Sequence, residues 1–149
     1  MSDARCQTRP AGAGDAAAVA GLAAGLAQSF AFSRARSGRS YPALPAGDGA
    51  CLPLAVNGHE RLGYLMGSGY LTFYADGPVA WAGEVFVRSQ YRGRGVGRAL
   101  MSASGQWAAA RHCTLVAPAT RRAAPFYRAL GYEESAIYLR KILDDQASE

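Results

Sequence analysis

The sequence predicts a single domain of the α/β (α+β) class, and two kinds of pattern predict it. Short runs rich in β-branched and aromatic residues, bounded by Gly, Pro, Asn and Asp, are typical of strands. Longer stretches carry apolar residues three, four and seven positions apart, as amphipathic helices do. The chain has 149 residues and half of them are hydrophobic. One compact domain over residues 1–149 is expected, because a second core needs a longer chain.

The first expected elements are a strand at Arg5–Arg9 and a helix at Ala16–Ala27. Pro10 ends the strand, and Asp15 precedes the helix as an N-cap residue would. Arginines before an Ala-rich run superficially resemble a signal peptide. The run holds few large apolar groups, however, and an amphipathic helix explains it better. Residues Phe30–Ala50 show no clear period, so a short helix and a long loop are expected there.

A β-hairpin and a central strand make up the middle of the chain. Asn57-Gly58 is a strong hairpin signal, and Asp76-Gly77-Pro78 marks the next turn. Glu84 is the one carboxylate in an otherwise apolar run, which is typical of a strand covered on both faces. The expected strands are Cys51–Val56, Arg61–Tyr70 with Leu71–Tyr74 as an extension or a separate piece, and Val79–Val87.

The C-terminal part carries two helix patterns and two strand patterns. A helix is expected to begin at Gly95, because the apolar residues that follow it form one stripe at helical spacing. The later elements are a short buried strand at Thr114–Ala117, a helix at Ala123–Leu130 ended by Gly131, and a closing strand or pair of strands at Tyr132–Ile142.

The charge balance is basic, with 16 Lys and Arg residues against 11 Asp and Glu, and all but one of the basic residues are Arg. Arginine makes bidentate contacts with phosphate, so a phosphorylated ligand fits this composition. Nucleic acid is not expected, because no basic run is interleaved with aromatic residues. A membrane partner is not expected either, since no apolar stretch approaches the ~20 residues of a span.

Three cysteines, Cys6, Cys51 and Cys113, are far apart in the sequence. An odd number at such spacing predicts neither a disulfide framework nor a CxxC metal site. A reducing, cytoplasmic location is the expectation.

The most informative stretch is Arg92-Gly93-Arg94-Gly95-Val96-Gly97-Arg98, between an expected strand and an expected helix. The first N–H groups of a helix lack intrahelical acceptors, and glycines leave them open to a ligand. The helix dipole and the arginines favour an anion there. The alternative is a glycine-rich connection with solvated arginines. A P-loop is excluded, since GxxxxGK(S/T) is absent, and the dinucleotide spacing does not match.

The pattern Arg92-x-x-Gly95-x-Gly97 resembles the acyl-coenzyme A signature of the GNAT superfamily of N-acetyltransferases. Residues 120–132, Thr-Arg-Arg-Ala-Ala-Pro-Phe-Tyr-Arg-Ala-Leu-Gly-Tyr, resemble the family's second signature, Asn-x-x-Ala-x-x-Phe-Tyr-x-x-Leu-Gly-Phe, at the usual separation. The resemblance covers nearly the whole chain and is weakest from Phe30 to Ala50. It implies a GNAT-like fold, with a mixed, mainly antiparallel sheet of about six or seven strands flanked by about four helices.

The resemblance also implies that acetyl-coenzyme A (acetyl-CoA) is the cosubstrate. The backbone of the Arg92 to Arg98 turn would hold the pyrophosphate. Backbone groups of Val85, Phe86 and Val87 would hold the pantetheine arm, in an opening where this strand splays from the one expected at Thr114–Ala117. The other expected cofactor contacts are Thr120, which stands where the family has Asn, and Phe126.

For catalysis, the resemblance implies that Tyr127 protonates the departing thiolate. Direct attack by an amine also needs a base. Glu84 is the candidate, with a water chain as the alternative, because many relatives carry the acidic residue one place earlier, where this chain has Gly83. No metal is required. The remaining candidates are expected to be structural: His59 and His112 in loops, and Cys113 in the core in preference to a role as nucleophile.

The expected reaction is direct transfer of an acetyl group to a primary amine of a small molecule or peptide. Two alternatives remain open: a longer acyl-CoA or acyl-carrier-protein donor, and a non-catalytic module that senses acyl-CoA. A monomer and a homodimer both fit. The residues proposed to line the acceptor pocket are Phe30, Phe32, Tyr41, Tyr64, Tyr70 and Tyr74.

Overall fold

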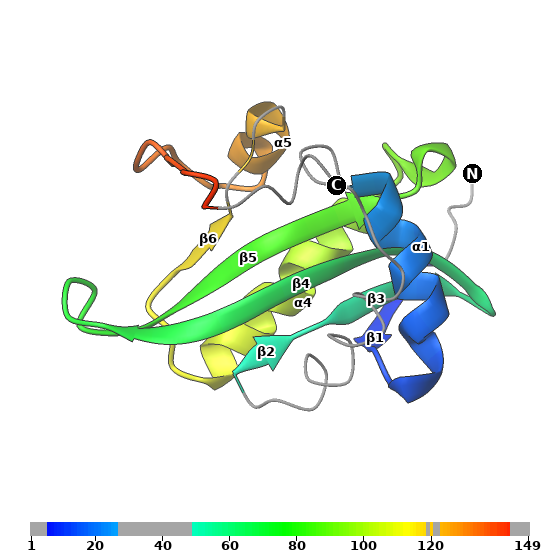
Figure 1. Cartoon of the computed structure of the whole chain (residues 1–149), viewed down its shortest axis with the longest axis horizontal. Helices are drawn as coiled ribbons and strands as arrows, with labels where there is room; N and C mark the ends of the chain where they lie inside the picture. Colours follow the sequence, from blue (N-terminus) through cyan, green and yellow to red (C-terminus); the bar gives the residue numbers. More distant parts are fainter. Residues whose placement is uncertain (1–5, 27–48, 119, 121–122, 144–149) are drawn as a thin grey trace.

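The computed structural model describes residues 6–26, 49–118, 120 and 123–143. Within these ranges a six-stranded sheet has the order β1-β3-β4-β5-β6, and β2 also pairs with β4 (Figure 1). Every pair is antiparallel except β5 and β6, which are parallel. The strands are β1 (Gln7–Pro10), β2 (Ala50–Cys51), β3 (Pro53–Asn57), β4 (Glu60–Thr72), β5 (Gly77–Val87) and β6 (Val116–Pro118). The prediction of a mixed, mainly antiparallel sheet is confirmed.

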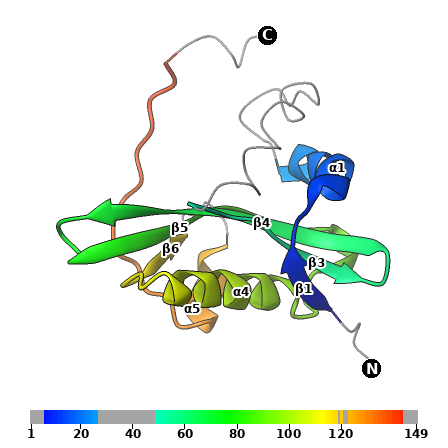
Figure 2. The same ribbon diagram turned by 90° about the horizontal axis from the view of Figure 1, so that it is seen from below.

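Helices cover both faces of this sheet. In the described part of the chain they are α1 (Ala16–Leu26), α4 (Val96–Ala110) and α5 (Ala124–Ala129), with 3₁₀ turns η1 (Ala13–Asp15) and η2 (Ser89–Tyr91). Figure 2 shows α1 on one face of the sheet and α4 and α5 on the other. The helix and loop predicted within Phe30–Ala50 lie almost entirely outside the described residues.

Each face of the sheet has its own hydrophobic cluster. Leu22 of α1 packs with Leu54 and Tyr64 on one face. On the other face, Leu100 of α4 packs with residues that include Leu65. Tyr64 and Leu65 are neighbours in β4 and point to opposite faces, as strand geometry requires. The middle of β4 is therefore buried on both sides.

The hairpin predicted at Asn57-Gly58 is confirmed, and Gly58 has the positive φ of 61° that such a turn requires. The strand boundaries differ in two places. Cys51 belongs to β2, which pairs with β4 at Gly67 instead of extending β3. At its other end β4 runs without a break to Thr72, so the first part of Leu71–Tyr74 is an extension of β4 and the rest is turn.

Asp15 caps the chain in a different way from the one predicted. It lies inside η1, where its carboxylate accepts the N–H of Gly12 (2.8 Å) and bonds to Arg9 (2.8 and 2.9 Å) and Arg61 (2.9 and 3.1 Å). The hydrogen bonds from Arg9 are the largest of the causes that hold the Asp15 pKa well below its usual range, against the opposing effect of burial. The carboxylate thus ties the start of α1 to β1 and β4.

Two strand predictions near the C-terminus need correction. The short strand predicted at Thr114–Ala117 is confirmed as β6, but its bounds are Val116–Pro118 and it is half-buried instead of buried, because in the described sheet it lies at the edge. No strand forms in the described residues that follow α5, so the closing strand at Tyr132–Ile142 is absent. A strand needs a neighbouring edge to pair with, and β6 offers only three residues, one of them Pro118 without an N–H.

Candidate active site

The turn predicted to bind an anion lies at the start of α4. Gly93 and Gly95 have φ values of 76° and 87°, in the left-handed region that favours glycine, and Gly95 is the N-cap of α4. No side chain caps this end, so the N–H groups of the first turn face outward. Arg94 and Arg98 are exposed, and within the described residues neither makes an ion pair or hydrogen bond.

The side chain of Arg92 has a structural contact that the sequence did not reveal. Its Nε donates to the carbonyl of Val87 at 2.9 Å, and its guanidinium lies 5.5 Å from the centre of the Phe86 ring. Arg92 therefore ties the turn to the end of β5. Close by, the hydroxyl of Tyr91 donates to Glu60 at 2.8 Å, which fixes the same segment to the start of β4.

One edge of β5 loses its partner just before this turn. The last pair between β5 and β6 is Ala82 with Pro118, and Figure 1 shows β5 continuing past the end of β6. The N–H of Arg88 donates to Leu62 in β4. Since backbone groups alternate along a strand, those of Val85 and Val87 face the open edge.

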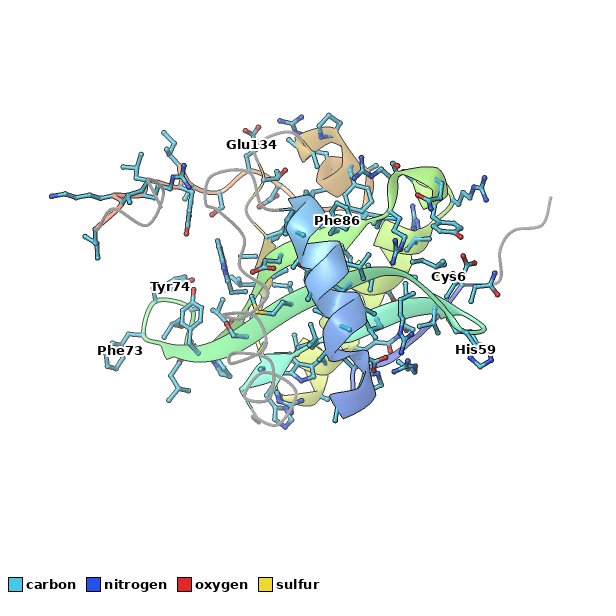
Figure 3. All side chains as sticks on the ribbon, turned by 45° about the vertical axis from the view of Figure 1, so that its right-hand side comes forward. Cys6, His59, Phe73, Tyr74, Phe86 and Glu134 are labelled. Carbon is cyan, nitrogen blue, oxygen red and sulfur yellow. The ribbon has the colours of Figure 1, made fainter. Side chains whose placement is uncertain are left out.

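Of the strand residues predicted to hold the cofactor, Phe86 is placed differently. Its backbone lies in the ladder with β4, opposite Tyr64, and its ring packs beside α1, since a Cβ on Gly25 would lie 2.7 Å from it. Figure 3 shows Phe86 next to that helix. The Val87 carbonyl is already an acceptor for Arg92. Val85 keeps its backbone groups at the open edge.

The second signature packs directly on the first. The ring of Phe126 lies against Gly97, where a Cβ would stand 3.0 Å from Cζ of Phe126. Tyr127 follows in α5 and is 8% exposed, within the cluster on the α4 face that includes Ala82. Thr120 caps the segment before α5, since its hydroxyl accepts the N–H of Ala123 at 2.8 Å.

The hydroxyl of Tyr127 makes no hydrogen bond with the described residues. Its ring makes edge-to-face contacts with Phe126 and Tyr132, at centroid distances of 4.9 and 5.9 Å. Burial raises the pKa of Tyr127, and the nearby Tyr132 adds to the effect. Within the described part of the chain, the phenol is therefore a neutral donor without a partner.

A bulge in β5 decides where Glu84 points. Met66 pairs with Glu84 and Gly67 pairs with Ala82, so Gly83 is an extra residue in the strand. The bulge resets the alternation, and Glu84 points to the α1 face, where the hydroxyl of Tyr64 donates to its Oε1 at 2.5 Å. Burial, and then Glu84, raise the Tyr64 pKa far above its usual range.

Tyr127 and Glu84 consequently belong to opposite faces of the sheet. Tyr127 packs in the cluster under α4, whereas Glu84 bonds to Tyr64 of the cluster under α1. Ala82, which contacts the Tyr127 cluster, is also the last residue of β5 paired with β6. Both side chains therefore flank the stretch of β5 where its edge opens.

The remaining candidates that the structure describes lie away from this region. His59 is exposed in the β3–β4 turn, and His112 is exposed just after α4. Cys113 is half-buried beside it. Tyr70 and Tyr74, proposed for an acceptor pocket, are 47% and 75% exposed. Tyr70 lies near the end of β4, and Figure 3 shows Tyr74 in the turn that follows. The other proposed pocket residues, Phe30, Phe32 and Tyr41, lie outside the described residues.

One aromatic pair next to Glu84 was not predicted from the sequence. Trp81 of β5 stacks on Tyr138 of the C-terminal segment, with a centroid distance of 5.6 Å and an interplanar angle of 22°. The sequence separation of the two residues gives no signal for this contact.

The comparison with protein families identifies the chain. The sequence model for the acetyltransferase (GNAT) domain matches residues 50–134, which is more than half of the chain. The chain belongs to the GNAT acetyltransferase family. A search of curated proteins gives no significant match.

Solved structures show the same GNAT fold. An integron cassette protein from the mobile metagenome of Cole Harbour Salt Marsh is 25% identical, with a TM-score of 0.84 over 96% of this chain and 94% of that one. Glucosamine-6-phosphate N-acetyltransferase from Arabidopsis thaliana is 16% identical, with a TM-score of 0.81 over 93% and 99%. Aminoglycoside N-acetyltransferase AAC(6')-Iy in complex with CoA is 20% identical, with a TM-score of 0.81 over 94% and 97%.

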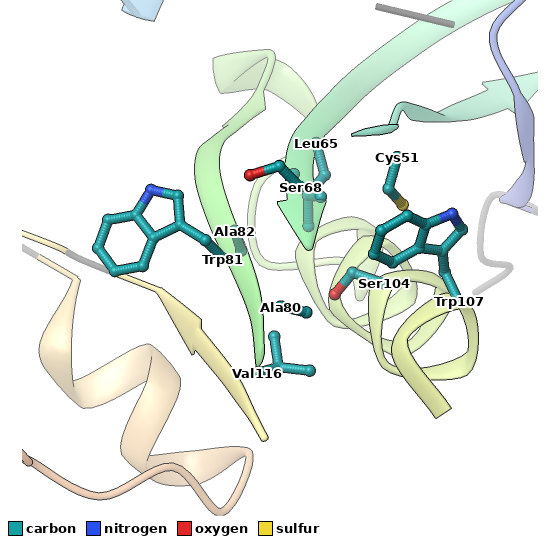
Figure 4. A pocket seen from close by; sticks show the side chains of 10 residues that line it. Cys51, Leu65, Ser68, Ala80, Trp81, Ala82, Ser104, Trp107 and Val116 are labelled. Carbon is teal, nitrogen blue, oxygen red and sulfur yellow. The ribbon is translucent and has the colours of Figure 1, made fainter. Parts of the chain in front are cut away.

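A separate pocket lies between the sheet and α4 of this GNAT domain. Figure 4 shows Ser104 and Trp107 of α4 on one side of it, with the Trp81 ring pointing away. The space exists because small residues such as Ala80 line it. Cys51 in its wall is buried, and burial raises its pKa to about 11 despite the opposing charge of Arg111. The pocket is apolar and lies on the opposite face of the sheet from Glu84.

The described residues hold neither a metal-binding cluster nor a membrane-spanning helix. No group of three or more His, Cys, Asp and Glu side chains in this part of the chain could hold a metal ion. Among the same residues, no helix has the length and apolar character to cross a membrane.

Proposed function

We propose that this GNAT-family protein transfers the acetyl group of acetyl-CoA to a primary amine by direct attack. One observation carries the proposal. The open edge of β5 begins after the Ala82–Pro118 pair and leads straight to the uncapped start of α4. A long thiol ester with a pyrophosphate at one end fits this arrangement, because strand backbone can hold its amide arm and a helix start can hold its anion.

The pyrophosphate would lie on the first turn of α4. The backbone N–H groups of Val96, Gly97 and Arg98 are the donors left free by helix geometry. The exposed side chains of Arg94 and Arg98 add positive charge beside them. In this proposal Arg92 shapes the turn and does not bind the pyrophosphate, since its N–H donates to the carbonyl of Ser89 at 3.3 Å and its side chain is bonded to Val87.

The pantetheine arm would run along the open edge of β5. Backbone groups of Val85 are the proposed partners of its amides, because those of Phe86 pair with β4. This path takes the thioester through the sheet between Tyr127 on the α4 face and Glu84 on the α1 face.

The chemistry follows from these two positions. The amine nitrogen attacks the carbonyl carbon of the thioester, the new C–N bond forms, and the C–S bond breaks. Glu84 takes the proton from the nitrogen, directly or through water, using the Oε2 oxygen that Tyr64 does not occupy. Tyr127 donates its proton or a hydrogen bond to the departing thiolate.

Tyr127 suits the second role through hydrogen bonding more than through full proton transfer. A thiol has a reference pKa of about 8.5 and a phenol of about 10. Burial raises the pKa of Tyr127 further. The phenol therefore stays protonated and stabilises the charge that develops on sulfur.

The test is a thiol-release assay with acetyl-CoA against a panel of primary amines, with product mass measured. Amine-dependent thiol release with one acetyl group added to the amine would support the proposal. Binding of acetyl-CoA by calorimetry without turnover on any amine would favour a sensor. Turnover with a longer acyl-CoA and none with acetyl-CoA would assign a different donor, and complete absence of CoA binding would overturn the proposal.

A further inference from the structure

The Trp81–Tyr138 pair lies beside the proposed base. Trp81, Glu84 and Phe86 follow one another on the α1 face of β5, because the bulge at Gly83 removes one step of alternation. The missing side chain of Gly83 makes room for the indole, since a Cβ there would lie 3.3 Å from Trp81 Nε1. The indole ring thus lies against the bulge, on the same face of β5 as Glu84.

Tyr138 is brought to this place from the far end of the chain. An ion pair between Arg128 and Glu134, at 2.9 Å, holds the start of the segment near α5. Figure 2 shows the segment passing the β6 end of the sheet toward the α1 side. Tyr138 stacks on Trp81 and is 68% exposed, less than its neighbours Ile137 at 86% and Leu139 at 84%. One face of the pair is therefore open to solvent.

We propose that the acceptor is a primary amine joined by a short chain to a flat aromatic group, which packs on the Trp81–Tyr138 pair. This inference rests on the proposed N-acetyltransferase function and names its substrate class. The same-face spacing of two strand residues, about 7 Å, sets the distance from the aromatic ring to the nitrogen near Glu84.

The charge pattern supports one cationic group in the acceptor. Glu84 is the single carboxylate between the rings of Trp81 and Phe86 on this face of β5. A protonated amine arriving there pairs with Glu84 and contacts the face of Trp81, which attracts cations. The indole N–H of Trp81 donates to no acceptor among the described residues, so it can bond to a polar substituent of the aromatic group.

Tryptophan fluorescence gives a direct test, because the chain has two tryptophans. Trp107 lies on α4 with Arg111 stacked at 4.2 Å, away from the site. In a Trp107→Phe background the signal of Trp81 is measured during titration with phenethylamine, ethylamine and glucosamine, with and without CoA. We expect phenethylamine to quench the Trp81 fluorescence saturably. The concentration needed should be at least about tenfold lower than for ethylamine or glucosamine.

The second arm uses turnover. Trp81→Ala and Tyr138→Ala are each expected to raise the KM for phenethylamine about tenfold while leaving kcat and the Kd of CoA near the wild-type values. Tyr138→Phe, which keeps the ring, is expected to restore the KM. An unchanged KM in Trp81→Ala, or equal binding of ethylamine and phenethylamine, would overturn the inference. Quenching by phenethylamine without any turnover would support the inferred binding of an aromatic amine and would refute the proposed acetyl transfer instead.

Discussion

Phe126 and Gly97 join the two signature segments of this protein. A Cβ on Gly97 would lie 3.0 Å from the end of the Phe126 ring, so the start of α5 rests on the first turn of α4. The same contact places Tyr127, the next residue, in the cluster beneath the sheet. The glycine therefore serves both the anion-binding turn and the position of the proposed acid.

Gly97→Val should force the Phe126 ring to move. The expected loss in the free energy of unfolding is about 1–3 kcal/mol, because overpacking displaces a side chain in a close-packed contact. Gly105 of the same helix provides the control, since a Cβ added there would meet no atom within 4 Å. Gly105→Ala should stabilise the helix by roughly 0.5–1 kcal/mol. Urea unfolding measures both, and an additive effect of Phe126→Ala with Gly97→Val would contradict the contact.

Gly95→Val should abolish CoA binding. The side chain would stand at the uncapped start of α4, and the positive φ of Gly95 is strained for a β-branched residue. Gly58→Val carries a similar strain in the β3–β4 turn, outside the Arg92–Arg98 segment. Calorimetry with CoA separates backbone strain from loss of the binding site. The Gly58→Val variant should bind CoA as the wild type does. Binding of CoA by the Gly95→Val variant would refute the assigned turn.

Asp15→Asn should destabilise the protein by about 2–3 kcal/mol near neutral pH, because charged hydrogen bonds to two arginines are lost. The Asp15 pKa is depressed in the folded state, so its contribution is present above the unfolded value of about 3.9 and is lost as the pH falls toward the folded value. The difference in the free energy of unfolding between wild type and Asp15→Asn, measured with urea, should therefore become smaller as the pH is lowered. Glu134→Gln, in an exposed ion pair, should change little, and an Asp15→Asn difference independent of pH would refute the assignment.

Cys51 should be unreactive in the folded protein. With its pKa raised to about 11 by burial, roughly one thiol in a thousand is ionised at about pH 8. A thiol-exchange reagent should label one fewer cysteine in the native state than in urea, and Cys51→Ala should remove that difference. Native labelling of Cys51 at the rate of the unfolded chain would contradict its burial.

Features that depend on residues close together in the sequence could be predicted from it. The hairpin at Gly58, the stripe of α4 and the turn at Gly95 each follow from spacing within a few residues. The position of Glu84 did not, because a bulge at Gly83 depends on pairing with β4. Such an extra residue leaves no mark in the strand's own sequence.

Features that depend on distant partners could not be predicted in this way. Asp15 has the sequence context of an N-cap, but its arginine partners come from β1 and β4. The C-terminal run at Tyr132–Ile142 has strand-like residues, but the edge strand β6 of the described sheet has only three residues for it to pair with. The stacking of Tyr138 on Trp81 joins residues that no local period connects.

Tyr127→Phe tests the proposed reaction most directly. The phenol makes no hydrogen bond with the described residues, so its removal should leave stability and the Kd of CoA unchanged. Its proposed donation to the departing sulfur predicts a fall in kcat of about 10²-fold or more in the thiol-release assay. Wild-type kcat in this variant, with CoA still bound, would contradict the role of Tyr127.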